Sequence, residues 1–242
     1  NVITYSAAIS ACEKGARWEH ALSLLSDMRT KGIEPNAITY GAAISACGKA
    51  REWRKALELL REVMPRRQVE PNVICYNAAM TACKNAGQWE KVLELFAEIQ
   101  DKPGLEPTLV SYNVAVAAVG QAGDIDRMVT LIADMKANDV SPDTVTYRTA
   151  IFAAMNNKRW RRATALVDDM TDAGLPPDRI SYKLAIQACE DAGQYDTAIE
   201  LANARDAPST RTNSRVAHQD PEKRRRLDLE QHRPHRPNGL TD

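Results

Sequence analysis

The chain has 242 residues, and its 32 Lys+Arg are balanced by 32 Asp+Glu, so its formal net charge is zero. A neutral chain has no global basic field with which to capture nucleic acid. Hydrophobic residues make up 44% of the chain and aromatic residues only 5%. This alanine-rich composition favours closely packed helices over a β-sandwich. No stretch approaches the roughly 20 apolar residues of a membrane span, so we expect no membrane partner.

Three markers recur along the chain with one period. The first is a tyrosine, and its copies are separated by 35, 36, 36, 35 and 35 residues: Tyr5, Tyr40, Tyr76, Tyr112, Tyr147 and Tyr182. Thirteen residues after each tyrosine comes Trp18, Trp53, Trp89, Ile125, Trp160 or Tyr195. A proline precedes each new repeat: Pro35, Pro71, Pro107, Pro142 and Pro177. Periods of this length indicate helical repeats.

Each repeat predicts two helices joined by a turn. In the first repeat a helix is expected from about Thr4 to Lys14, because apolar residues recur there at helical spacing. Gly15 predicts the turn, as do glycines in later copies (Gly87, Gly123 and Gly193). The second helix carries an apolar stripe of Trp18, Ala21, Leu22, Leu25 and Met28. Pro35-Asn36 then ends the unit and offers Asn36 as the cap of the next helix.

The predicted fold is therefore all-α, an α-solenoid of stacked helix-turn-helix repeats with a period of 35–36 residues. The array is expected over residues 1–206, with repeats at about 2–36, 37–72, 73–108, 109–143 and 144–178 and a partial repeat at 179–206. The two longer units gain one residue near Met64-Pro65 and Lys102-Pro103-Gly104, where loop adjustments are expected. Residues 207–242 lack apolar periodicity and are predicted to be a disordered, basic, proline-containing tail.

The sequence offers no set of catalytic or metal-binding residues. Cys12, Cys47, Cys83 and Cys189 recur at the same place in their repeats and are expected to be small buried side chains. Neither an HxE motif nor a CxxC pair occurs, which excludes a zinc deaminase site. His232 and His235 fall in the predicted tail, as does a basic run at 223–226, interpreted as solvated or, alternatively, as an RNA-contacting or localisation patch. We expect no metal, no cofactor and no enzymatic activity.

Repeated strings carry a family resemblance. They are Val2-Ile3-Thr4-Tyr5, the second helix from Trp18 to Met28, and the closing Gly32-Ile33-Glu34-Pro35-Asn36. In register over about residues 1–206, they resemble the pentatricopeptide repeat family. The resemblance implies a modular binder of single-stranded RNA, with roughly one base per repeat contacted by two or three side chains. It also implies a role in organellar RNA processing, stabilisation, editing or translation, in the chloroplast or mitochondrion, and we expect a monomer. Because the chain begins inside the pattern, we expect a fragment of a longer protein whose targeting signal lies elsewhere.

The resemblance further implies which residues contact RNA. The residue after each tyrosine and the last residue of the repeat would contact the base edge: Ser6 with Asn36, Gly41 with Asn72, Asn77 with Thr108, Asn113 with Asp143, and Arg148 with Asp178. By family preference the first pair favours A, the second weakly A, the third a pyrimidine and the fourth U. The Arg148/Asp178 pair is atypical and is expected to form a salt bridge, and Lys183 in the sixth repeat is atypical too.

Two further sets follow from the same resemblance, each with an ordinary structural alternative. The residue two before each tyrosine would clamp bases, or else be a core residue at the helix start: Ile3, Ile38, Ile74, Val110, Val145 and Ile180. Lys14 and Lys49 would contact phosphate, or else be ordinary solvated charges. Basic character at this position fades along the chain. The alternative function is a helical scaffold that binds proteins and does not contact RNA, which the neutral charge, Gly41 and Arg148 would favour.

Overall fold

The computed structural model describes residues 1–206, and throughout this range the regular structure is helical, without a strand. The all-α repeat fold expected from the sequence is confirmed. The tail expected to be disordered, with its histidines and basic run, lies outside the described residues. The part of the chain that is described contains no helix both long enough and apolar enough to cross a membrane.

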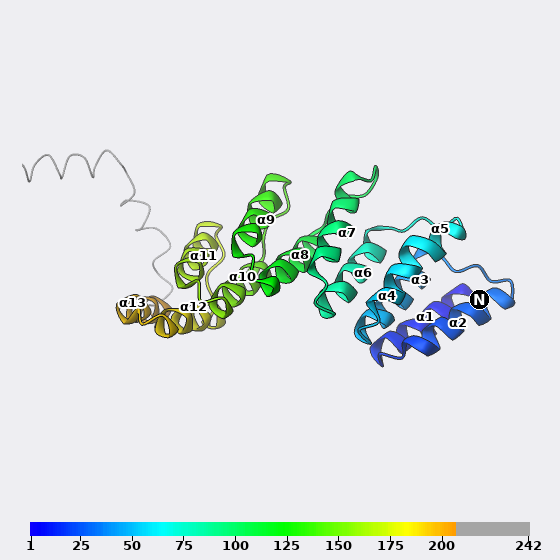
Figure 1. Cartoon of the computed structure of the whole chain (residues 1–242), viewed down its shortest axis with the longest axis horizontal. Helices are drawn as coiled ribbons and strands as arrows, with labels where there is room; N and C mark the ends of the chain where they lie inside the picture. Colours follow the sequence, from blue (N-terminus) through cyan, green and yellow to red (C-terminus); the bar gives the residue numbers. More distant parts are fainter. Residues whose placement is uncertain (207–242) are drawn as a thin grey trace, which may run out of the picture. The chain divides into compact units, whose positions relative to one another are not determined.

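The helices come in successive pairs (Figure 1). The first helices of the repeats are α1 (Val2–Lys14), α3 (Ala37–Lys49), α6 (Val73–Asn85), α8 (Leu109–Ala122), α10 (Thr144–Asn156) and α12 (Arg179–Asp191). The second helices are α2 (Trp18–Thr30), α7 (Trp89–Asp101), α9 (Ile125–Ala137), α11 (Trp160–Asp172) and α13 (Tyr195–Asp206). In the second repeat this helix is divided into α4 (Trp53–Glu58), η1 (Leu59–Val63) and α5 (Met64–Arg66).

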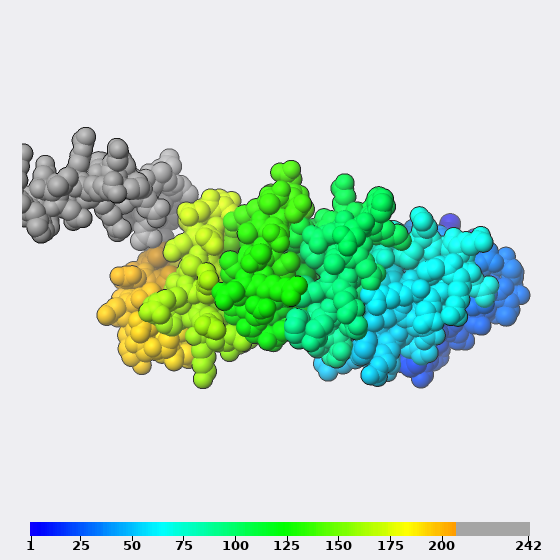
Figure 2. All heavy atoms as spheres, turned by 45° about the horizontal axis from the view of Figure 1, so that its top comes forward, coloured from blue at the N-terminus to red at the C-terminus, as the bar shows by residue number. Residues whose placement is uncertain are grey.

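The first helices form one continuous layer. Helix α3 packs on α1 and α6, and the series continues through α8 and α10 to α12. Helices α2, α4, α7, α9 and α11 each pack against the first helix of their own repeat and against that of the next. Neighbouring repeats therefore lie in direct contact, as bands of successive colour in Figure 2. This stacking buries one surface of every first helix, so a ligand can contact only the residues that stay exposed.

Small side chains set how closely the first helices approach. A Cβ atom added to Gly48 would lie 2.9 Å from the Cβ of Ala82 in the next repeat, and one added to Gly120 would lie 2.7 Å from that of Ala153. Real Cβ atoms do not approach so closely. Cys47, Cys83 and Cys189 are buried, as expected, while Cys12 is half-buried. The repeated alanine, glycine and cysteine positions are thus packing positions.

The turn inside each repeat needs a left-handed residue eleven positions after the tyrosine. That residue is Ala16, Arg51, Gly87, Gly123, Lys158 or Gly193, with φ between 51° and 87°. Gly15 lies in the first turn, as expected, with φ −90°, and Ala16 directly after it carries the positive φ. Glycine lowers the cost of this conformation, but the flanking helices impose it even where glycine is absent.

The extra residue of the second repeat is absorbed inside its helix and not in a loop, which corrects the expectation for Met64-Pro65. The segment Leu59–Val63 winds as a π-helix, and the Met64 N–H bonds to the Leu59 carbonyl five residues back. Pro65 follows immediately, and a proline has no N–H for the ordinary helical bond. A single π turn is the usual form of such an insertion. In the third repeat the expectation holds: α7 ends before Lys102, which is extended as residues before proline prefer.

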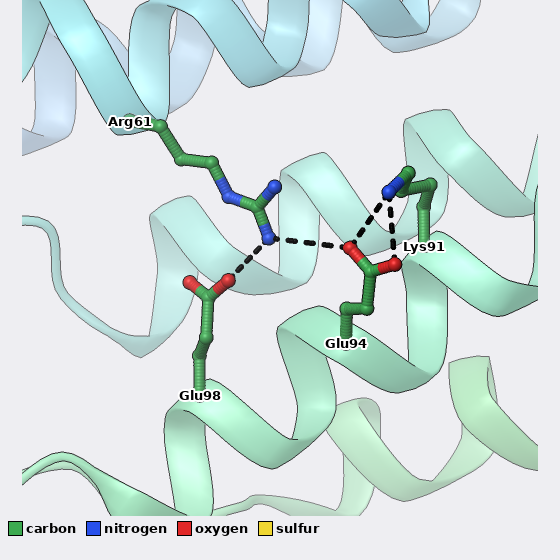
Figure 3. Close-up of polar contacts among 4 residues, drawn as sticks. All are labelled: Arg61, Lys91, Glu94 and Glu98. Atoms are coloured by element: carbon green, nitrogen blue, oxygen red, sulfur yellow. Dashed lines mark hydrogen bonds and ion pairs between the residues drawn. The ribbon is translucent and has the colours of Figure 1, made fainter.

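Ion pairs connect the second helices of the second and third repeats (Figure 3). The Arg61 guanidinium on η1 reaches Glu98 and lies 3.8 Å from Glu94, both on α7. Lys91 bonds Glu94 at 2.8 Å, one turn away on the same helix. The four side chains are 36–46% exposed, and pairs open to solvent add little stability. The cluster therefore links two neighbouring second helices, while the first-helix layer carries the fold.

Candidate functional site

The last residue of each repeat is the N-cap of the next first helix. In Asn36, Asn72, Thr108, Asp143 and Asp178 a side-chain oxygen accepts the backbone N–H of the residue three positions later. The backbone of each cap is extended, with ψ between 170° and 179°. Asn, Asp and Thr suit this place because they satisfy an otherwise unpaired helical N–H. The local sequence thus fixes these five side chains at helix starts.

Each cap lies beside the residue that follows the tyrosine of the preceding first helix. A third residue, at the third position of the new helix, completes the group, which we call a junction. The five junctions are Ser6/Asn36/Thr39 (one), Gly41/Asn72/Cys75 (two), Asn77/Thr108/Ser111 (three), Asn113/Asp143/Thr146 (four) and Arg148/Asp178/Ser181 (five). The structure therefore bonds the two members of the pairs in junctions three, four and five to each other and links those of junction one through Thr39.

Junction four is a connected polar network. The Asn113 amide donates from Nδ2 to Asp143 Oδ1 over a long 3.4 Å. The Thr146 hydroxyl lies 2.6 Å from Asn113 Oδ1 and 2.8 Å from Asp143 Oδ1. The backbone N–H of Asp143 in turn donates to Thr146 Oγ1 at 3.1 Å, which closes a capping box. Three side chains from two helices are thus held in one arrangement, and Thr146 is fully buried beneath them.

Junction three has the same connections with a hydroxyl in place of the carboxylate. Asn77 Nδ2 donates to Thr108 Oγ1 at 3.3 Å, and the Ser111 hydroxyl donates to Asn77 Oδ1 at 2.7 Å. The Thr108 N–H donates to Ser111 Oγ at 3.0 Å. Asn77 and Thr108 are half-buried, while Ser111 is fully buried. In both junctions the amide oxygen turns inward, toward the buried hydroxyl.

Junctions one and five are bonded differently. Ser6 and Thr39 share a hydrogen bond of 2.8 Å, and Thr39 donates to Asn36 Oδ1 at 2.9 Å, so Thr39 links the pair. In junction five the Arg148 guanidinium lies 3.4 Å from Asp178 Oδ2, the salt bridge expected from the sequence. The other oxygen of Asp178 accepts from the Ser181 hydroxyl at 2.7 Å. Arg148 is therefore already partnered by its own cap.

Junction two lacks the network. Gly41 has no side chain and is buried, and Cys75 stands where the other junctions have Thr or Ser. The Cys75 thiol donates outside the junction, to the Ala37 carbonyl at 3.3 Å. Asn72 Oδ1 caps the Cys75 N–H at 3.1 Å and has no partner on the preceding helix. Only Asn72 is left to present a polar group here.

Hydrogen bonding controls the ionisation of both cap carboxylates. Partial burial alone would raise the pKa of Asp143, but the bonds donated by Thr146 and Asn113 lower that pKa below its ordinary value. The pKa of Asp178 is likewise lowered, with burial opposing and the Ser181 bonds and the Arg148 charge prevailing. Both carboxyls are accordingly ionised near neutral pH and can only accept hydrogen bonds.

The six β-branched residues at the second helical position are all exposed. Ile3 is 79% exposed, and the least exposed of the set, Val145, is 48% exposed. The others are Ile38, Ile74, Val110 and Ile180. The alternative that they are core residues is wrong, because a core residue is removed from water. An apolar side chain therefore flanks every junction on the surface.

The two lysines expected to contact phosphate differ in their surroundings. Lys49 forms an ion pair with Glu13 of the preceding repeat, with Nζ 3.0 Å from Oε1. Lys14 is exposed, and no ion pair involves it within residues 1–206. Of the pair, Lys14 is thus the cation more readily available to a ligand.

The sequence analysis missed the third member of every junction. Thr39, Ser111, Thr146 and Ser181 are the buried polar residues of the described chain. Their signal is a capping residue followed three positions later by Ser or Thr, a capping-box pattern. Phe152 was missed too: it is 50% exposed, one turn after Arg148, where earlier repeats carry Ser10, Ser45, Thr81 and Ala117. Within residues 1–206 no three His, Cys, Asp or Glu side chains gather as a metal site.

Solved structures similar to this chain share its fold. The pentatricopeptide repeat protein PPR10 from maize is 24% identical, with a TM-score of 0.68 over 88% of this chain and 30% of that chain. PPR10 in complex with an 18-nt psaJ RNA element is 25% identical, with a TM-score of 0.62 over 84% and 28%. The PPR domain of Arabidopsis thaliana PRORP1 in complex with tRNA is 16% identical, with a TM-score of 0.64 over 78% and 98%. The chain thus spans less than a third of the length of PPR10.

Family models match along the described helices. The pentatricopeptide repeat domain matches residues 58–122 and 130–192. The PPR repeat family matches residues 1–49, and the PPR repeat matches residues 38–64 and 110–140. No curated protein matches the sequence. These matches cover more than half of the chain, and they agree with the helix pairs, caps and period described above; the chain belongs to the pentatricopeptide repeat family.

Proposed function

We propose that residues 1–206 bind single-stranded RNA, with one base at each junction. The observation that carries the proposal is the row of junctions itself, in which polar pairs such as Asn77/Thr108 and Asn113/Asp143 are held together and flanked by an exposed β-branched residue. RNA-binding repeats that contact one base each use two or three side chains for it. Support also comes from the similar PPR10 and PRORP1 structures, which are complexes with RNA.

The chemistry of junction four favours uracil. Asn113 turns its oxygen inward, so the free hydrogen of Nδ2 is its outward group. Asp143 Oδ2 accepts none of the bonds to Asn113 or Thr146 and keeps its acceptor capacity. A donor beside an acceptor complements the O4 acceptor and N3–H donor of uracil. Cytosine presents the opposite polarity, a donor amino group beside an acceptor nitrogen.

The other junctions should be less selective, because they do not present a fixed donor beside a fixed acceptor. In junction three the Thr108 hydroxyl can donate or accept, so a pyrimidine of either polarity fits beside the Asn77 amide. Junction one, with Ser6 and Asn36, is proposed to favour A. Junction two offers Asn72 alone and should contribute a weak preference for A at most. Junction five is assigned no base because Arg148 and Asp178 neutralise each other.

The flanking residues would hold the strand. Ile3, Ile38, Ile74, Val110, Val145 and Ile180 offer apolar contact to the faces of neighbouring bases. Lys14 would contact phosphate, and Lys49 would do so after leaving Glu13. With a formal net charge of zero, affinity should be modest and should fall with added salt.

Equilibrium binding to short RNAs tests this proposal. An oligomer that contains A-A-Y-U, labelled at one end, should bind the chain more tightly than its complement. The same pair measured at low and high salt separates phosphate attraction from base selectivity. Equal binding of all oligomers, or no binding at any salt, would contradict the proposal.

The cellular setting is proposed from the family alone. We expect an organellar transcript, in chloroplast or mitochondrion, as the target and a monomeric chain as the binding form, acting in processing, stabilisation, editing or translation. No reaction is assigned to residues 1–206. Binding to a protein partner without any RNA affinity would favour the scaffold alternative, and a pull-down in the presence and absence of ribonuclease distinguishes the two.

A further inference from the structure

The buried hydroxyl at the third helical position is the part of each junction without an assigned role. It recurs in junctions one, three, four and five as Thr39, Ser111, Thr146 and Ser181, and all four residues are fully buried. A residue that caps its helix only would bond to the cap alone. Thr146 and Ser111 do more, because each also reaches the asparagine of the preceding repeat, at 2.6 Å and 2.7 Å.

We propose that Thr146 is a positioning residue that sets which end of the Asn113 amide faces the bound base. This inference rests on the proposed function. By holding Oδ1 of Asn113 inward, the hydroxyl leaves an N–H donor outward, and the junction then accepts uracil and disfavours cytosine.

The hydrogen bonds around Thr146 favour one orientation of the Asn113 amide. The Asp143 N–H donates to Thr146 Oγ1 at 3.1 Å, so the hydroxyl is supplied with a donor from the backbone. Its own single proton is left for an acceptor, and Asn113 Oδ1 is the nearer of its two choices. The backbone N–H of the helix cap thus donates to the hydroxyl, and the hydroxyl donates to the amide oxygen of Asn113.

The opposite orientation of the amide is unfavourable. With the Asn113 amide turned over, its oxygen would lie about where Nδ2 now lies, 3.4 Å from Asp143 Oδ1. Asp143 is ionised and can only accept, so two acceptors would face each other without a proton between them. Asp143 and Thr146 therefore favour the same orientation from opposite sides of the amide.

Junction two and junction five show what happens without this bond. In junction two the thiol of Cys75, a weak donor, turns to the Ala37 carbonyl, and Gly41 has no amide to position. In junction five the Ser181 hydroxyl bonds only to Asp178, and the side chain above it is Arg148, which has no acceptor end to orient. The hydroxyl contacts an amide in junctions three and four, where an asparagine follows the tyrosine.

The test uses three variants of the full chain at position 146. Thr146→Val keeps the shape and removes the hydroxyl, Thr146→Ser restores it, and Thr146→Cys places there the residue that junction two already tolerates. Two RNAs that differ only in U or C at the base assigned to junction four are titrated against each protein. The melting temperature is measured in parallel, because loss of the capping box alone lowers stability without changing base preference.

The expected result is a U-over-C affinity ratio that falls about fivefold in Thr146→Val, since one hydrogen bond is lost. Thr146→Ser should keep the wild-type ratio. Thr146→Cys should lower the ratio as Thr146→Val does, so the test stays decisive if the valine variant does not fold. A ratio unchanged within about twofold in both valine and cysteine variants overturns the inference and leaves the proposed function standing. A wild-type protein with no base preference, or no RNA binding, overturns the proposed function and this inference together.

Discussion

Junctions four and two are built at the same place in the repeat and differ in what they present. In junction four, Asn113, Asp143 and Thr146 form one hydrogen-bonded network across two helices. In junction two the glycine and cysteine at the equivalent positions leave Asn72 by itself. At both junctions the two first helices pack against each other. The difference teaches that the fold is carried by the stacking positions, while the junction residues are free to vary.

Exchanging the pair of junction four for that of junction one should have the largest effect. The double variant Asn113→Ser with Asp143→Asn reproduces Ser6 and Asn36 and should move the preference at that base from U to A. Because each preference is worth about tenfold, the U-to-A affinity ratio should change about 100-fold. Competition titrations with oligomers differing at that base measure the change. An unaltered preference would show that the base is selected elsewhere.

Substitutions of two glycines of helix α3 distinguish a packing position from a junction position. Gly48→Ala should destabilise the protein by about 1–3 kcal/mol, because the new Cβ meets Ala82 at 2.9 Å and the core is overpacked. Gly41→Ala should stabilise it by about 0.5–1 kcal/mol, because its Cβ finds ordinary contacts of 3.7 and 3.9 Å and alanine favours helix. Denaturant unfolding of both variants checks the signs. Equal effects would mean that α3 does not pack as described.

Junction two should gain base selectivity when a hydrogen-bonded network like that of junction four is built into it. The variant Gly41→Asn with Cys75→Thr places an amide above a hydroxyl, as in junction four, and should raise base selectivity at the second position about tenfold. The single change Gly41→Asn should give less, because its amide would lack the positioning hydroxyl. Affinities for the four RNAs that differ at the second base provide the measurement. A gain as large with Cys75 retained would argue against a role for the hydroxyl.

The smallest expected effect is on stability in acid. The pKa of Asp143 is below its ordinary value of 3.8 in the folded chain, so its ionised form stabilises the folded state at higher pH. That contribution is complete above the unfolded pKa and is lost as the pH falls below about 4 through the folded value. Asp143→Asn, which keeps a capping side chain, should flatten the fall in melting temperature below pH 4. An identical acid profile for variant and wild type would contradict the assigned hydrogen bonds.

The sequence predicted the fold well because its information is periodic. Helix pairs, caps and stacking faces follow from apolar spacing and from Pro-Asn or Pro-Asp at the repeat ends. Which residue of the first turn takes the positive φ was not predicted: it is Ala16 and not Gly15. The insertion near Pro65 was absorbed by a π turn. Both outcomes depend on how neighbouring helices hold the backbone, which local sequence does not encode.

Two of the three residues of each junction were predicted from the sequence, and the third residue and the hydrogen bonds were not. The resemblance paired Asn113 with Asp143, and the structure places them side by side. The direction of their hydrogen bonds depends on the buried Thr146 of the next helix, which sequence spacing does not connect to Asn113. The exposure of Ile3 and its equivalents also required the structure, because a β-branched residue at a helix start suits a core equally well.

Selection from a random RNA pool with the full chain tests whether each junction contacts one base. We expect an enriched motif with successive preferences for A, weak A, a pyrimidine and U. Of these four positions, the most informative should be the one that faces junction four, and the least informative the one that faces junction two. A pool that stays random after selection, or a motif strongest at the second position and flat at the fourth, would contradict the account.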